Sequence, residues 1–294
     1  TFIVLFTRSF LPSGTLLVVL QPKRSSPIRI INNIFVQLSF NGSKYKFKNT
    51  FFMVSKNQIK LINSLQQKKY RFEHQLFIAE GVKVIQELLQ SKIVLEHLFA
   101  TEESFSSFEC TSKTEISAQE MKKISVLSTP SSCLALFKIP TPKKTETSGL
   151  IVALDAIRDP GNLGTIVRLC DWFGVTQIVC SNETVDLYNP KVVQATMGSI
   201  ARVNVNYLDL KTFISQSSMP VFGTFMDGKN IYKEALPQEG IIIFGNEANG
   251  ISAEIEKIIK NRIAIPQFGT VQETESLNVA TATAIVLSEF RRKN

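Results

Sequence analysis

Hydrophobic and polar positions change in blocks along the second half of the chain, and the blocks predict strands and helices in turn. The apolar runs that predict strands lie at 150–157, 177–180, 203–207, 221–225, 241–245 and 263–266. The patterns that predict helices lie at 162–173, 190–200, 209–216, 252–261 and 277–291. Strands that alternate with helices favour a mostly parallel sheet with helices on both faces. We therefore predict an α/β domain over residues 149–294.

The segment 53–140 predicts a second, smaller α/β domain. Its first helix carries Ile59, Ile62 and Leu65 roughly on one face. The pattern continues with a strand and a helix over 76–92 and further strands in 94–104 and 131–140. Five basic residues surround the first helix, and they predict either a solvated surface or one that contacts RNA: Lys56, Lys60, Lys68, Lys69 and Arg71.

Two segments lie outside these domains. Residues 141–148 contain one proline and no apolar residue, which predicts a linker. Residues 1–52 contain seven Lys or Arg and no Asp or Glu, so they supply +7 of the net charge of +8. Since the first methionine is Met53, we expect 1–52 to be a disordered or artefactual leader, with a signal or transit peptide as the alternative.

The cysteines, the histidines and the first apolar segment bear on metal sites, disulfides and membrane spans. The four cysteines form no C-x-x-C pair, and neither of the two histidines lies near a cysteine. A zinc site or a disulfide framework is therefore not expected, and a reducing cytoplasm fits best. The apolar segment 1–20 is interrupted by Arg8, Pro12 and Gly14, which argues against a transmembrane helix. We expect no metal and no membrane partner.

Polar clusters follow three of the predicted strands, at 158–168, 245–250 and 266–278. Binding sites in parallel sheets lie at the carboxyl ends of strands, so these clusters are candidates for a shared site. In the first cluster, Asp159 and Asn162 bracket a turn, and Gly164 permits close backbone approach. Arg168 follows on the helix and offers a planar fork suited to phosphate. An ordinary turn, a helix cap and a surface arginine are the alternative.

The second cluster follows the apolar run 241–245. Glu247 is a candidate for binding or acid–base work, although a glutamate that bonds the backbone at a strand end is the alternative. Gly250 permits a sharp turn, and Ser252 is expected to cap the helix that begins at Ala253.

The third cluster precedes the last predicted helix. Ser276 is expected to cap that helix, and Asn278 is expected in its first turn. The small residues after Val279 allow close packing against a backbone or a ligand; a helix that merely packs closely is the alternative.

Taken together, the three clusters resemble the SpoU (TrmH-like) family of RNA ribose 2′-O-methyltransferases in the SPOUT superfamily. The family's first motif, N-x-G-x-x-x-R, corresponds to Asn162, Gly164 and Arg168. Its second, a glycine–glutamate motif, corresponds to Gly245, Asn246, Glu247 and Gly250. Its third, I-P followed by S-L-N-V, corresponds to Ile265, Pro266, Ser276, Leu277, Asn278 and Val279. The stretch 189–199 is also similar to the family. Ala248 and Gln194 depart from it, where glycine and arginine are usual.

The resemblance implies a fold, a cofactor and a set of site residues. The fold would be an α/β domain with a trefoil knot, preceded by a small α/β RNA-binding domain, and the protein would be a homodimer acting on rRNA or tRNA. Helix 162–173, with Trp172, and the last helix would lie at the dimer interface; Trp172 in the core is the alternative. Catalytic roles are implied for Arg168, Asn162, Glu247, Ser276 and Asn278. Contacts to S-adenosylmethionine are implied for Gly245, Asn246, Gly250, Ile265, Pro266, Leu277 and Ala280.

Several alternatives stay open at this point. Arg168 is either a base in a special environment or a group that stabilises the developing oxyanion. The chain could also be a non-catalytic RNA-binding or ribosome-assembly protein on the same fold. A dinucleotide-binding oxidoreductase is disfavoured, because no G-x-G-x-x-G follows any predicted strand.

Overall fold

The protein is described by a computed structural model, which places residues 3–5, 19–21, 53–268 and 276–292. The chain forms two compact units, Thr1–Phe52 and Met53–Asn294. In the first unit, β1 (Ile3–Leu5) pairs antiparallel with β2 (Val19–Gln21). The rest of the predicted leader lies outside the described residues. Among the described residues, none of the helices has the length and hydrophobicity of a membrane span.

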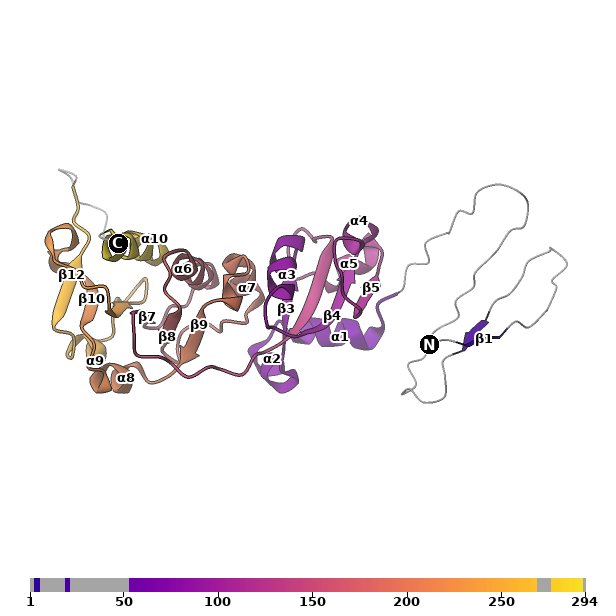
Figure 1. Ribbon diagram of the computed structural model, residues 1–294, viewed down its shortest axis with the longest axis horizontal. Coiled ribbons are helices and arrows are strands. Elements are labelled where there is room, and N and C mark those ends of the chain that lie inside the picture. Colours follow the sequence, from indigo (N-terminus) through magenta and orange to yellow (C-terminus); the bar gives the residue numbers. More distant parts are fainter. Residues whose placement is uncertain (1–2, 6–18, 22–52, 269–275, 293–294) are drawn as a thin grey trace. The chain divides into compact units, whose positions relative to one another are not determined.

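The first part of the unit Met53–Asn294 is built on a four-stranded sheet with helices on both sides (Figure 1). The sheet order is β3 (Leu76–Glu80), β6 (Cys133–Lys138), β4 (Leu95–Ala100), β5 (Lys113–Glu115), antiparallel except for the β4–β5 pair. The helices are α1 (Lys56–Ser64), α2 (Lys68–His74), α3 (Val82–Leu89), α4 (Glu102–Phe105) and α5 (Ala118–Ile124). Apolar residues of α1 and α5 pack on one face of the sheet, and those of α3 pack on the other. We call this part the small domain.

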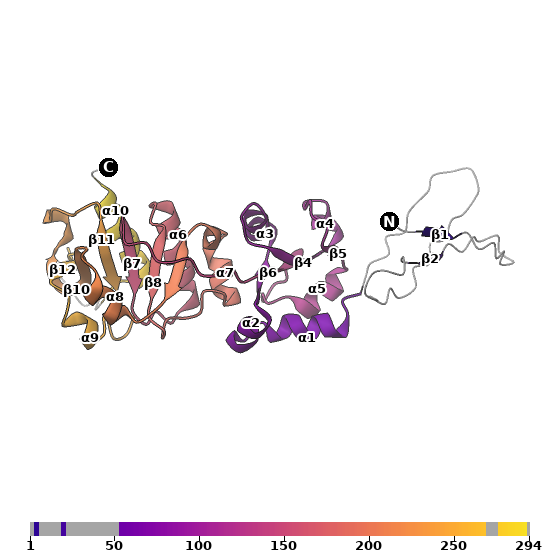
Figure 2. The same ribbon diagram turned by 60° about the horizontal axis from the view of Figure 1, so that its bottom comes forward.

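The second part contains a six-stranded sheet in which every pair is parallel. Its order is β12 (Asn261–Ala264), β10 (Val221–Asn230), β11 (Gly240–Phe244), β7 (Leu150–Leu154), β8 (Gln177–Cys180), β9 (Asn204–Tyr207). The helices are α6 (Pro160–Trp172), α7 (Pro190–Thr196), α8 (Leu210–Gln216), α9 (Ala253–Glu256) and α10 (Val279–Arg291). The predicted α/β architecture with a parallel sheet and helices is confirmed, and Figure 2 shows helices on both sides of this sheet. We call this part the large domain.

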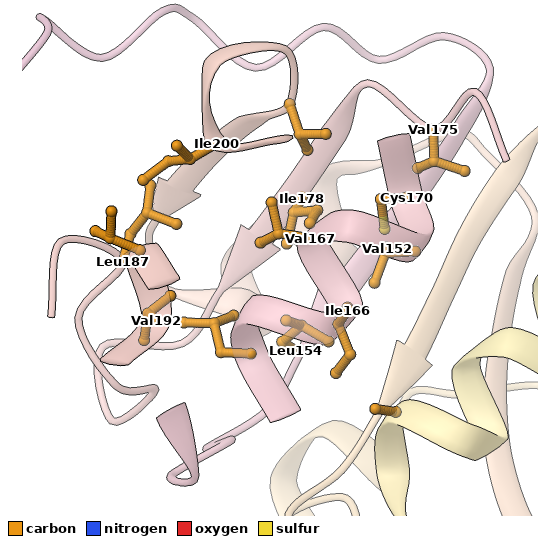
Figure 3. Close-up of a cluster of buried hydrophobic side chains, with 14 of the residues drawn as sticks. Val152, Leu154, Ile166, Val167, Cys170, Val175, Ile178, Leu187, Val192 and Ile200 are labelled. Atoms are coloured by element: carbon orange, nitrogen blue, oxygen red, sulfur yellow. The ribbon is translucent and has the colours of Figure 1, made fainter. Parts of the chain in front are cut away.

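The two faces of the large sheet are buried by alternate residues of the same strands. Val152 and Leu154 of β7 pack against α6, α7 and α10, as Figure 3 shows for α6. Ile151 and Ala153 of β7 belong instead to the cluster that includes α8 and α9. Because both faces are covered, the strands are continuous apolar runs, and this continuity makes them predictable from the sequence.

Several predicted elements differ in extent from the observed ones. The helix predicted at 252–261 is α9, which ends at Glu256, and the strand predicted at 150–157 ends at Leu154. Helix α7 ends at Thr196 rather than at residue 200, because Met197 and Gly198 adopt left-handed φ angles of 50° and 96°. A Cβ at Gly198 would lie 2.5 Å from Cβ of Glu87 on α3, so this contact with the small domain requires glycine. The predicted strand in 94–104 ends at Ala100, and β10 continues five residues beyond its predicted end.

A buried ion pair joins the small and large domains. Arg71 of α2 is only 2% exposed, and its Nε donates a hydrogen bond to Asp186 Oδ2 at 2.8 Å. Its Nη1 donates to the carbonyl oxygens of Leu65 and Gln66, both at 2.8 Å. The expectation that Arg71 is part of a basic surface is therefore wrong: the large domain supplies a carboxylate that draws the guanidinium inside.

The predicted linker 141–148 has no helix or strand but is fastened to the edge strand β9. Asn204 Nδ2 donates to the carbonyl oxygen of Lys143 at 3.4 Å, and Asn206 Nδ2 donates to Thr145 Oγ1 at 2.9 Å. These bonds hold the connection between the domains against the large sheet.

Candidate active site

The first polar cluster forms the turn from β7 into α6. Asp159 is the N-cap of α6, and its Oδ1 accepts a hydrogen bond from the backbone N–H of Asn162 at 2.8 Å. Pro160 occupies the first turn, where its missing N–H costs no helical bond. This cap fixes the backbone of Asn162 at the start of α6.

Before this turn, Asp155 and Ala156 hold the loops together, and neither is among the candidate residues predicted from the sequence. Ala156 has a left-handed φ of 57°, and its N–H donates to Ser181 Oγ at 3.0 Å. Buried Asp155 accepts a hydrogen bond through Oδ2 from the backbone N–H of Ser252 at 2.7 Å. The sequence carried one signal for this role, since Asp155 is a carboxylate directly after a buried strand.

The second cluster is a tight loop that closes on itself. Asn246 and Gly250 exchange two backbone hydrogen bonds, both 2.9 Å long. A Cβ at Gly245 would lie 2.1 Å from the carbonyl carbon of Gly250, so residue 245 must be glycine for the loop to close this way. Ala248 is compatible with the loop, since its N–H donates to Asn246 Oδ1 at 2.9 Å.

The side chain of Asn246 is used within the protein. Its Nδ2 donates to the carbonyl oxygen of Ala156 at 2.7 Å, and its Oδ1 accepts from Ala248 and Asn249. Asn246 therefore fastens the second loop to the first. Ser252 is the N-cap residue of α9, as predicted by position, but its side chain makes no capping hydrogen bond.

The residue of the third cluster that caps the last helix is not the predicted one. Asn278, and not Ser276, is the N-cap of α10, and its Oδ1 accepts from the N–H groups of Ala280 and Thr281 at 3.0 and 3.2 Å. The prediction that Ser276 caps the helix is wrong. Both residue types are good caps, and what distinguishes Asn278 is an amide nitrogen that remains able to donate elsewhere.

Side chains from all three clusters meet in one row of hydrogen bonds. Asn162 Nδ2 donates to Glu247 Oε1 at 2.7 Å, and Asn278 Nδ2 donates to Asn162 Oδ1 at 2.9 Å. We call these three residues the amide row. The row joins positions 85 and 116 residues apart in the sequence, and its members are accessible from solvent. It thus presents a fixed set of polar groups at the carboxyl edge of the sheet.

Arg168 does not contact the amide row. It is exposed, and within the described residues it has no hydrogen bond or ion pair. Six residues along an α-helix amount to about 9 Å of rise and about 120° of rotation from Asn162, so the two side chains leave α6 in different directions. In the described residues, Arg168 makes no hydrogen bond or ion pair with any member of the amide row.

Gly164 serves the packing of two helices. A Cβ at this position would lie 2.4 Å from Cβ of Ala195 and 2.7 Å from the carbonyl oxygen of Val192, both on α7. The close backbone approach predicted at Gly164 is therefore made by α7. The motif residue Gly164 thus sets the position of α6, which carries Asn162 and Arg168.

The remaining predicted ligand-binding residues follow β12 and begin α10. Ile265 and Pro266 are half-buried, whereas Leu277 is 49% exposed. In the described part of the chain, Ile265 and Leu277 make no backbone hydrogen bonds outside helices and strands, so their N–H and C=O groups can bind a ligand. Ala280 is 5% exposed, and its N–H is already bound by Asn278, which leaves only its small side chain for close approach.

Trp172, at the end of α6, is 84% exposed. It is therefore not a core residue. Nearby, Arg291 of α10 donates through Nε to the carbonyl oxygen of Phe173 at 3.0 Å and fastens α10 to the end of α6.

Known protein families and structures match both domains of the chain. Residues 149–288 match the SpoU rRNA Methylase family, and residues 56–135 match the MRM3-like substrate binding domain. The chain is 27% identical over 245 residues to the 23S rRNA (guanosine(2553)-2′-O)-methyltransferase RlmP of Bacillus subtilis, covering 81% of this chain and 97% of that protein.

Among solved structures, a TrmH-family protein from Porphyromonas gingivalis is 37% identical, with a TM-score of 0.75, and the match covers 83% of this chain and all of that one. The AdoMet-bound rRNA methyltransferase from Sinorhizobium meliloti is 28% identical, with a TM-score of 0.72, over 83% of this chain and 98% of that one. With its motifs in order and this likeness over more than four fifths of the chain, the protein belongs to the SpoU (TrmH-like) family of RNA methyltransferases.

Proposed function

We propose that this protein transfers a methyl group from S-adenosylmethionine to a ribose 2′-hydroxyl of ribosomal RNA. The observation that carries the proposal is the amide row, in which Asn162, Glu247 and Asn278 meet from three separate loops. The relatives that match both domains support the reaction and the substrate class, because they are named as rRNA methyltransferases.

The loops beside the amide row fit the proposed cofactor. S-adenosylmethionine supplies an electrophilic methyl group on a sulfonium, and it has no pyrophosphate that would need a glycine-rich phosphate loop. Ile265 and Leu277 offer backbone groups that can bind an adenine edge, together with apolar side chains that can cover its face. The closed turn Gly245–Gly250 supplies a rigid wall, with Pro266 on the chain after β12.

The chain's own residues would position the ribose and act on its proton. Glu247 holds Asn162, and Asn162 holds Asn278, so the row has one fixed orientation before RNA binds. Arg168 would act at the 2′-oxygen. A free guanidinium keeps its proton at neutral pH, so stabilisation of the developing negative charge on that oxygen is the role its chemistry suits best. Ser276 lies two residues before the N-cap Asn278, near enough in sequence to bind the same substrate.

We propose that the site is completed by two chains. Arg168 is exposed, without a partner in the described residues, and about 120° around α6 from Asn162. In a homodimer that pairs α6 and α10 around the exposed Trp172, Arg168 of one protomer would reach the amide row of the other. A two-fold dimer of this kind would contain two equivalent shared sites.

The trefoil knot is also part of the proposal. It is supported by the sheet order, in which β10 lies between β11 and β12, and by the family membership. The segment after β12 returns to the first loop, where Asn278 bonds Asn162. The chain that follows β12 thus lies beside the loop that follows β7.

Calorimetry and a transfer assay test the function together. The wild-type protein should bind S-adenosylmethionine and methylate rRNA. Arg168→Ala should keep cofactor binding and the fold while losing methyl transfer, because the arginine acts on the ribose oxygen. Absence of cofactor binding by the folded wild-type protein would contradict the proposal.

A further inference from the structure

A groove lies between the small and large domains and takes no part in the amide row. It has a volume of about 1030 Å³ and is lined by α2, the end of α3, the segment 139–143, the loop 182–188 and β9. Pockets for small ligands have volumes of about 300–1,000 Å³, so this groove is large enough for a segment of a polymer.

The lysines of this groove are available to a ligand. Lys68, Lys92 and Lys143 line it and are exposed. None of the three has an ion-pair partner within the ranges that the structure describes. Three unpaired ammonium groups along one groove favour a polyanion.

The carboxylates of the groove are already neutralised. Glu87 receives a hydrogen bond from Arg202 Nη1 at 2.7 Å, and Asp186 is bound by the buried Arg71. These pairs leave no free carboxylate among the described lining residues to repel phosphate. The positive character of the lysines is therefore not offset within the groove.

An aromatic ring and several amides lie in the same groove. Phe72 is 46% exposed, and the ammonium group of Lys68 lies 5.9 Å from its ring centre. A large exposed aromatic beside a lysine is the combination on which an unpaired base can stack while its phosphate is bound. Asn182 and Gln90 supply further exposed polar groups.

One wall of the groove is bonded to the loop that leads to Asn162. Within the wall 182–188, the backbone N–H of Val185 donates to the carbonyl oxygen of Ile157 at 2.8 Å. Tyr207 of β9 donates to the carbonyl oxygen of Val185 at 2.6 Å, and burial raises the pKa of this phenol, so it stays protonated. The groove is therefore connected through this loop to the turn that precedes Asn162.

From these observations we infer that the groove binds a single-stranded stretch of the substrate RNA beside the nucleotide to be methylated. Phe72 would stack on a base, and Lys68 and Lys92 would bind phosphates. The inference rests on the proposed function for the direction of the strand, but binding in the groove can be measured without methyl transfer.

The test compares two charge-matched variants of the full chain and one aromatic variant. The probe is a fluorescein-labelled, single-stranded 12-nucleotide RNA of mixed sequence, and its affinity is measured by anisotropy at several salt concentrations. Lys68→Gln with Lys92→Gln should lower the slope of log affinity against log salt by about 1.4, at about 0.7 per phosphate contact. Phe72→Ala should weaken binding by about 5- to 150-fold, the range for loss of one stacked base.

The control is Lys257→Gln with Lys260→Gln, which removes the same charge from exposed lysines near the amino end of β12. This control should bind the probe as the wild type does. A 4-thiouridine version of the probe should cross-link, on irradiation, to peptides that contain 68–75 or 139–143. Groove variants that bind like the control, cross-links confined to other surfaces, or a wild type that does not bind the probe would each overturn the inference.

Calorimetry on the same proteins separates this inference from the proposed function. The groove variants should keep the wild-type affinity for S-adenosylmethionine, since the groove lies outside the amide row. A wild type that binds the probe in the groove but does not bind S-adenosylmethionine would contradict the proposed function and leave the groove as an RNA site.

Discussion

Replacing Asn162 by aspartate probes the amide row with a nearly isosteric change. The donor that lies 2.7 Å from Glu247 Oε1 becomes a carboxylate oxygen at the same place. Two unit charges about 2.7 Å apart in water repel by about 1.5 kcal/mol. Loss of a hydrogen bond to a charged group adds about 1.5 kcal/mol at the lower end of its range. The sum of about 3 kcal/mol corresponds to a roughly 150-fold loss of kcat/KM.

The pH dependence of the activity of Asn162→Asp distinguishes charge repulsion with Glu247 from a general disturbance of the fold. When two carboxylates share a site, the pKa of one of them rises, so Asn162→Asp takes up a proton as pH falls. The protonated aspartic acid can again donate to Glu247, and it still accepts from Asn278. The activity of Asn162→Asp relative to wild type should therefore recover as pH falls.

The assay is methyl transfer to rRNA, with kcat/KM measured from pH 8.5 down to pH 5.5. Asn162→Ala is the matched control, because it removes both hydrogen bonds of the side chain and introduces no titrating group. Its activity relative to wild type should be low and independent of pH. If Asn162→Asp and Asn162→Ala keep a constant ratio across the range, the contact with Glu247 does not govern the site.

Three further predictions follow from other contacts. Gly245→Ala should weaken binding of S-adenosylmethionine at least about tenfold in calorimetry, because its Cβ would lie 2.1 Å from the backbone of Gly250; wild-type affinity would show that the loop tolerates the methyl group. Co-expressed Arg168→Ala and Asn278→Ala should regain about a quarter of wild-type transfer, since half of the dimers would be mixed and each would contain one intact site of two; no regain would argue for sites within single chains. Arg71→Met should lower the free energy of unfolding in urea by about 3–5 kcal/mol, because it leaves Asp186 buried without its partner. A change below about 1 kcal/mol would mean that water replaces the guanidinium.

The elements of the large domain could be predicted because their signal is local. Strands such as β7 and β11 are buried on both faces, so each is an unbroken apolar run between turn residues. The order of strands in the sheet could not be predicted in this way. Nothing within β10 indicates that it lies between β11 and β12, because that position depends on the path of the whole chain.

The meeting of three polar side chains could be predicted from the sequence, but its geometry only in part. Asn162, Glu247 and Asn278 come together as their places after strands suggested. The local pattern ranks Ser276 and Asn278 alike as caps of α10, whereas the bond from Asn278 to Asn162 is tertiary. The burial of Arg71 is likewise not predictable from its neighbours, because the partner that buries it, Asp186, is 115 residues away.

The most direct test of the central claim is nucleoside mass spectrometry. Purified protein is incubated with S-adenosylmethionine, deuterated at the methyl group, and with rRNA that lacks modification, and the RNA is then digested to nucleosides. We expect one labelled 2′-O-methylnucleoside that is absent with Arg168→Ala. Label on a base, or no labelled nucleoside with folded protein that binds the cofactor, would contradict methyl transfer to the ribose.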